Sequence, residues 1–205
     1  IIFKNEFFFE NNSTQLNFNK LDSFLNDNIF KIEKILGNFV EKMNIIIETP
    51  DFFNLQISMK KHNHNENINS NIILYLIKSA MHQCEKTVQN KRIIHILIDN
   101  YLIDNVHFTE LPLNQKCKNF SLDISFICLP NELIKDIEKT LKKFQISINQ
   151  ILSASYIDKY VSDTDINFFE MTSKIIDGHN KNEVKLVNKI SKNKGFFEKF
   201  FNLFS

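Results

Sequence analysis

The chain has 205 residues, of which 43% are hydrophobic, enough to build the core of one or two small domains. Its 25 Lys and Arg residues are nearly cancelled by 24 Asp and Glu residues, so the strong positive field of a nucleic-acid-binding protein is missing. No stretch approaches the roughly 20 apolar residues of a membrane-spanning helix. We therefore expect a protein that binds no nucleic acid and does not span a membrane.

Glycine and cysteine usage narrows the chemistry further. A phosphate-binding loop needs closely spaced glycines, and the chain has only Gly37, Gly178 and Gly195. The cysteines are too far apart for a disulfide framework or a thiolate metal site and indicate a reducing compartment: Cys84, Cys117 and Cys128. We expect no cofactor, no metal and no catalysis. The chain begins at Ile1 instead of Met, so we expect residues to precede it.

The first predicted element is an amphipathic helix over residues 21–43. Its apolar residues recur at helical spacing, Asn19 is a candidate N-cap, and Gly37 costs it about 1 kcal/mol relative to alanine. Pro50 then interrupts the chain. Residues 54–59 follow as a predicted strand.

The next segment, residues 60–66, is polar and predicts a loop. Within it, His62 and His64 form an H-x-H pair without a third metal ligand at suitable spacing, so we expect both to be exposed to solvent. An apolar stripe predicts a helix over 68–88, and the β-branched run that follows predicts a buried strand over 93–98.

Residues 120–128 alternate apolar and mostly polar side chains, which predicts a strand with one exposed face and with Phe126 buried. Pro130 ends this strand, Asn131 is a candidate cap of a second helix, and 146–152 predicts a returning strand. The fold class expected is therefore α/β (α+β), with a small mixed sheet and flanking helices.

Several stretches resemble the bacterial actin-like division protein family FtsA. They read HILIDNYLID from His95 to Asp104, ELPLN around Pro112, SLDISFI, and NELIKDIEKTLKKFQISINQILSAS. The similarity covers roughly 21–160, and 59–155 is similar to the extra subdomain that distinguishes FtsA from other actin-like proteins. In that family this subdomain contacts neighbouring subunits and division partners.

The resemblance implies a division of the chain into a partial actin-like lobe (1–50), a partner-binding subdomain (51–160), a linker (161–194) and an amphipathic membrane-surface helix (195–205). The chain departs from the family where Phe108, Asn114 and Cys117 replace glycines. It also lacks the family's nucleotide-binding motifs, which implies loss of the ATP site and of the second actin lobe.

The candidate partner-binding or turn-forming residues match the loop of that family: Tyr101, Asp104, Pro112 and Asn114. Asn114 is able to adopt a left-handed turn. We expect His95, which lies in an apolar strand, to be a hydrogen-bonded core histidine. Asp99, Asp104 and Glu110 are expected to be solvated carboxylates near a turn.

The last ten residues contain an aromatic stripe at helical spacing, flanked by lysines that suit anionic headgroups. The predicted membrane-binding residues are Phe196, Phe197, Phe200, Phe201, Phe204, Lys192, Lys194 and Lys199. Docking of this helix on the protein's own core is the alternative.

Together these features predict a non-catalytic adaptor of cell division, cytoplasmic and peripheral on the inner face of the bacterial membrane. Other division proteins and the anionic membrane surface are its expected partners, and self-association is a further expectation. Three alternatives stay open: a fragment of an actin-like ATPase whose nucleotide site lies outside this chain, a pilus-assembly relative, and a degenerate remnant.

Overall fold

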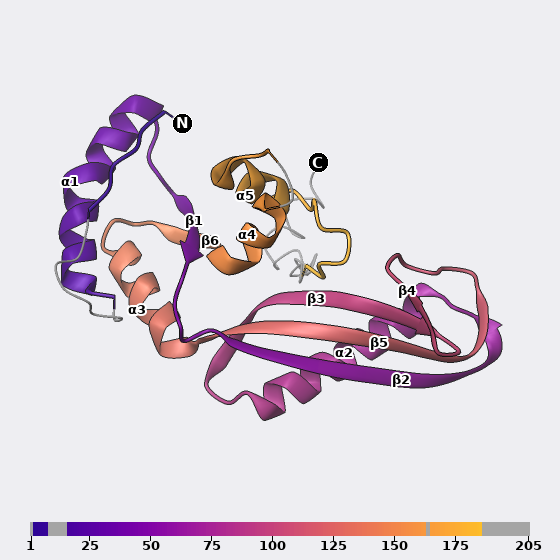
Figure 1. Ribbon diagram of the computed structural model, residues 1–205. Coiled ribbons are helices and arrows are strands. Elements are labelled where there is room, and N and C mark those ends of the chain that lie inside the picture. The colour runs from indigo at the N-terminus through magenta and orange to yellow at the C-terminus, as the bar shows by residue number, and fades with distance from the viewer. Residues whose placement is uncertain (1, 8–15, 163–164, 186–205) are drawn as a thin grey trace, which may run out of the picture.

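The computed structural model describes residues 2–7, 16–162 and 165–185, which form five helices and six strands (Figure 1). The strands belong to a four-stranded sheet and a two-stranded sheet. The mixed α/β class predicted from the sequence is confirmed. Its strands are divided between two sheets instead of forming one.

The larger sheet is antiparallel, with the strand order β2-β5-β3-β4. Its strands are β2 (Phe53–Asn67), β5 (Lys116–Pro130), β3 (Lys91–Ile103) and β4 (Val106–Phe108). The helix α2 (Ser70–Thr87) covers one face of this sheet (Figure 1). Its N-cap is Asn69, whose side chain accepts hydrogen bonds from the backbone N–H groups of Asn71 and Ile72.

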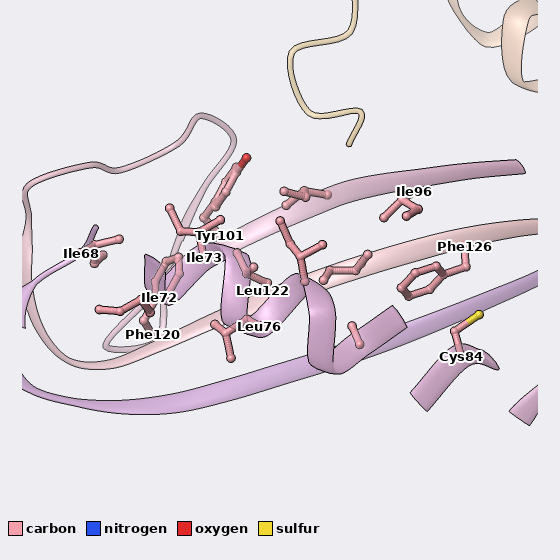
Figure 2. Close-up of a cluster of buried hydrophobic side chains, with 14 of the residues drawn as sticks. Ile68, Ile72, Ile73, Leu76, Cys84, Ile96, Tyr101, Phe120, Leu122 and Phe126 are labelled. Atoms are coloured by element: carbon pink, nitrogen blue, oxygen red, sulfur yellow. The ribbon is translucent and has the colours of Figure 1, made fainter. Parts of the chain in front are cut away.

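A single apolar core joins α2 to the sheet. Figure 2 shows Ile72, Leu76 and Cys84 of the helix pointing toward Phe120, Leu122 and Phe126 of β5. Alternate residues of β5 enter this core, as the period-two pattern predicted, because successive side chains of a strand point to opposite faces. Phe126 is fully buried, which confirms its predicted place.

The smaller sheet pairs β1 (Lys42–Ile47) with β6 (Ser147–Ser153) in parallel. It packs with α1 (Phe18–Leu36) and α3 (Asn131–Lys142) around a second core. The whole β2–β5 unit is inserted in the chain between β1 and α3.

Two further helices, α4 (Ala154–Val161) and α5 (Phe168–Ile176), pack on each other around Tyr156, Met171 and Ile175. Ile127 of β5 belongs to the same buried cluster, so these helices are fastened to the larger sheet. The range 161–194, for which we expected a linker, thus contains a packed helix. With nine residues, α5 is too short to give a strong periodic signal in the sequence.

The helix predicted over 21–43 is shorter than expected. It begins after Asn17, whose side chain accepts from the N–H of Lys20, so Asn17 and not Asn19 is the cap. It ends at Gly37, which has a φ of 70° and donates its N–H to the carbonyl of Glu33. A left-handed residue after the last turn is the usual way to end a helix, so Gly37 is a stop signal and Met43 belongs to β1.

The loop predicted over 60–66 is also wrong, because β2 continues to Asn67. β2 lies at the edge of the sheet, where polar side chains such as His62 and His64 remain exposed without any cost of burial. An irregularity between His62 and Glu66 accommodates the positive φ values of His64 and Asn65. The predicted cap Asn131 is instead the first helical residue of α3, and Pro130 precedes it.

Candidate functional site

The segment 180–185, which we name the C-terminal strap, lies along the edge of β3. The N–H of Ile98 donates to the carbonyl of Asn182 at 2.9 Å, and the N–H of Val184 donates to the carbonyl of Ile96 at 2.9 Å. In Figure 1 the strap is the yellow segment beside β3. It therefore occupies part of a strand edge that β4, paired only with residues 101–103, leaves open.

A buried histidine–glutamate pair holds the middle of the strap. Nδ1 of His95 lies 2.7 Å from Oε1 of Glu183, and their side chains are 0% and 3% exposed. The other ring nitrogen, Nε2, accepts the backbone N–H of Ser153 at 3.1 Å. Because a backbone N–H can only donate, Nε2 carries no proton, so Nδ1 carries one and donates it to Glu183. His95 is thus the hydrogen-bonded core histidine that the sequence predicted.

The direction in which the His95 side chain points depends on an irregularity in β3. The register between β3 and β5 shifts between Ile93 and His95, so the strict alternation of faces is broken at this point. The imidazole ring lies 4.4 Å from the ring of Tyr156, in the cluster that α4 and α5 form, instead of entering the core under α2.

Tyr156 and Asn180 extend the hydrogen-bond network around the His95–Glu183 pair. The hydroxyl of Tyr156 donates to Oε2 of Glu183 at 3.2 Å and accepts from Nδ2 of Asn180 at 2.9 Å. Burial raises the pKa of Tyr156 far above its ordinary value, so the phenol stays protonated and remains a donor. The Glu183 carboxylate thus receives one hydrogen bond on each oxygen, which offsets the cost of burying its charge.

The strap is fastened at both ends as well. Near its start, the Tyr101 hydroxyl donates to Oδ1 of Asn182 at 3.1 Å, and Nδ2 of Asn182 donates to the carbonyl of Thr109 at 3.0 Å. At its end, Nζ of Lys185 donates to the carbonyls of Ile175 and Ile176 in the last turn of α5. A lysine at this position satisfies carbonyls that have no partner within the helix.

The four predicted partner-binding residues have defined places. Tyr101 is 2% exposed and donates its hydroxyl to Asn182 of the strap, and Pro112 is also buried. Asn114 has a φ of 63°, the left-handed conformation that asparagine adopts more readily than most residues, as predicted. Asp104 and Asn105, with φ values of 47° and 71°, form the two-residue turn between β3 and β4.

Asp104 also fastens that turn to β5. Its carboxylate accepts the N–H groups of Asn119 at 2.8 Å and Lys118 at 3.1 Å. These backbone hydrogen bonds lower the pKa of Asp104. Its side chain thus shapes the β3–β4 hairpin.

The apolar side chains that this region presents to solvent are different ones. Leu111 and Leu113, on either side of buried Pro112, are 43% and 44% exposed, and Val106 of β4 is 59% exposed. Single apolar residues in a polar loop have no periodic pattern, so the sequence does not mark these three as a group. We name Val106, Leu111 and Leu113 the hairpin-loop patch.

The remaining candidates are the histidines His62, His64 and His95. His62 and His64 are exposed, as expected, and their rings contact each other at a centroid distance of 4.4 Å. Across residues 2–7, 16–162 and 165–185, no three His, Cys, Asp or Glu side chains gather in a way that would hold a metal ion. At His95, both ring nitrogens are engaged in hydrogen bonds, so the buried cluster fastens the strap instead of offering a free base.

The predicted membrane-binding residues, Lys192, Lys194, Phe196, Phe197, Lys199, Phe200, Phe201 and Phe204, lie outside the described residues. Among the helices that are described, none combines the length and the apolar character needed to cross a bilayer. No protein-family model matches the chain, and no curated protein matches it. The class that the fold and the site define is thus a mixed α/β protein whose C-terminal strap is locked to its larger sheet.

Proposed function

We propose that this protein is a non-catalytic adaptor of cell division, held peripherally on the cytoplasmic face of the membrane by residues 195–205 and binding a partner protein through residues 51–160. The resemblance to FtsA and the aromatic, lysine-rich tail motivate this proposal. The observation that best supports it is the strap. Its buried contacts fix residue 185 on the folded unit, so any membrane contact of the tail would position that unit at the surface.

The α/β unit also offers a surface for a partner. It has its own core between α2 and the sheet, and it presents the hairpin-loop patch away from that core. Exposed apolar side chains on the β4 strand and the loop that follows it are candidates for contact with a partner protein.

The membrane tether predicts a strong effect of one charge in the tail. Phe200→Glu should abolish sedimentation of the protein with phosphatidylglycerol vesicles, because a charged group replaces an inserted ring worth up to about 3 kcal/mol. Raising the salt concentration should weaken the binding of the parent protein, since each lysine near an anionic surface adds about 1 kcal/mol that salt screens.

Phe169→Glu is the matched control for this experiment. Phe169 lies on α5 and is 57% exposed, so the same substitution there places a charge on the folded unit and leaves the tail intact. This variant should sediment like the parent protein. If the parent protein fails to sediment, or if Phe200→Glu sediments equally well, the membrane tether is wrong.

The partner-binding part predicts a separate phenotype. A fluorescent fusion of the full chain should collect at the division site of a bacterial cell, and Leu111→Asp combined with Leu113→Asp should leave it spread along the membrane. Both side chains are more than two-fifths exposed, so these changes should cost little stability. A parent fusion that spreads evenly along the membrane would contradict the division role while leaving the tether intact.

A further inference from the structure

A groove of about 460 Å³ lies where the start of α1, the connection between β1 and β2, and the start of α3 meet. Its apolar lining consists of Leu16, Phe18, Pro130 and Leu133. Four carboxylates also line it: Glu48, Asp51, Glu132 and Asp136. We name this feature the acidic groove. It combines an apolar lining with acidic side chains, a combination that fits a segment carrying both aromatic and basic residues.

Within the described part of the chain, no ion pair neutralises the carboxylates of the acidic groove. None of its described lining residues is Lys or Arg, and none of its carboxylates takes part in an ion pair of the described chain. Glu48 accepts the N–H of Ser155, and Asp51 accepts the hydroxyl of Thr49. Glu132 lies in the first turn of α3, where the helix dipole stabilises its negative charge. The helix dipole does not account for Glu48 and Asp51, which come from another segment.

The chain itself carries a segment of the complementary chemistry. Residues 186–205 contain five phenylalanines and four lysines, Lys189, Lys192, Lys194 and Lys199, against the single acid Glu198. The net positive charge of this segment is attracted to the four carboxylates of the groove, and its phenylalanines suit the apolar lining.

The strap brings the start of this tail close to the groove. Tyr156 in the first turn of α4 binds Glu183 of the strap at 3.2 Å, and the residue before it, Ser155, binds Glu48 of the groove at 3.0 Å. The strap and the groove therefore flank the same helical turn. Ten extended residues, 186–195, span up to about 33 Å, several times the length of that turn.

We propose that residues 186–205 dock in the acidic groove of their own chain, with phenylalanines against its apolar lining and lysines beside its carboxylates. A short tether gives the tail a millimolar effective concentration at the groove, which favours this occupant over a second copy at lower protein concentrations. Docking hides the aromatic side chains until an anionic surface competes for the lysines. Only this release step rests on the proposed membrane function.

The test uses a spin label at Ser205→Cys in the full chain. Labelling is selective because the native cysteines are at most 1% exposed, and burial raises the pKa of the Cys128 thiol to about 12 and also raises those of Cys84 and Cys117. Without lipid, the label should broaden the methyl NMR signals of Leu133. Glu132→Lys combined with Asp136→Lys should weaken docking about fivefold, as expected for two exposed charge pairs, and should reduce the broadening accordingly.

Two further variants distinguish a local charge effect at the acidic groove from an effect of net charge. Glu85→Lys combined with Glu110→Lys makes the same change in net charge at exposed positions away from the groove, and it should leave the broadening intact. Adding Lys192→Glu and Lys194→Glu to the groove variant should restore the broadening by reversing both partners. If the groove variant unfolds, screening by salt in the parent protein gives the same readout.

The outcomes separate this inference from the proposed function. Absence of broadening at Leu133 in the parent protein would overturn tail docking, whether or not the protein sediments with vesicles. An equal loss of broadening in the control variant, Glu85→Lys combined with Glu110→Lys, would also overturn tail docking, because the effect would then come from net charge alone. Broadening that persists when phosphatidylglycerol vesicles are added supports tail docking and counts against the membrane tether.

Discussion

Phe126→Ala should lower the free energy of unfolding by about 3 to 5 kcal/mol, the range found when a fully buried phenylalanine is truncated. Phe126 lies on β5, an interior strand of the larger sheet, and pairs with Leu55 of β2 and Ile96 of β3. Its ring is 0% exposed, so the surrounding side chains belong to three strands and α2, and they cannot all move to fill the cavity. Equilibrium unfolding in urea measures the change.

Phe39→Ala provides the control for this prediction. Phe39 is 85% exposed and lies between α1 and β1, so its truncation should change the free energy of unfolding by less than about 0.5 kcal/mol. A change below 1 kcal/mol for Phe126→Ala would mean that the core under α2 is not packed as described.

The central elements were predictable because burial and periodicity agree in them. The alternation that ends at Cys128 places every second residue of β5 in the core, and the stripe from Ile68 to Cys84 places one face of α2 against it. Such elements lie inside the sheet or cover it, so an apolar residue is required at each inward position. The hydrophobic pattern of these elements is therefore enough to predict them.

Edges and ends were not predictable by the same reasoning. The second half of β2 is held by backbone pairing with β5 and needs no apolar side chains, so its His, Asn and Lys residues resemble a loop. The apolar spacing of α1 continues into β1, although the left-handed conformation at Gly37 ends the helix before the strand begins at Lys42. In both cases the hydrophobic pattern is compatible with two structures, and backbone geometry decides between them.

The strap was missed for another reason, which is the distance along the chain. His95 and Glu183 are 88 residues apart, and nothing in the polar stretch around Glu183 marks it as buried. The sequence did indicate that a histidine in an apolar strand requires a hydrogen-bonding partner. Which acid provides it depends on how α4 and α5 pack against the sheet.

His95→Leu should lower the free energy of unfolding by about 3 to 5 kcal/mol, because it leaves the buried carboxylate of Glu183 without its imidazole donor. Glu183→Leu removes the charge but leaves the His95 N–H without an acceptor, which should cost about 1 to 3 kcal/mol. The double variant should be destabilised by at least about 1 kcal/mol less than the sum of the two, since neither the buried carboxylate nor the imidazole N–H is then left without the other. Amide hydrogen exchange at Ile98 and Val184 should accelerate in each variant as the strap loosens.

The two single variants and the double variant form a double-mutant cycle, for which the exposed pair Arg92 and Glu138 gives the matched control. These side chains lie 3.0 Å apart but are 49% and 45% exposed, so water solvates either one when its partner is replaced by leucine. Their coupling should stay below about 1 kcal/mol, and the strap amides should exchange as in the parent protein. The difference between the two cycles isolates burial as the cause, because both pairs join side chains that are distant in sequence. Additive effects at His95 and Glu183, within about 0.5 kcal/mol, would show that the strap is not held by this pair.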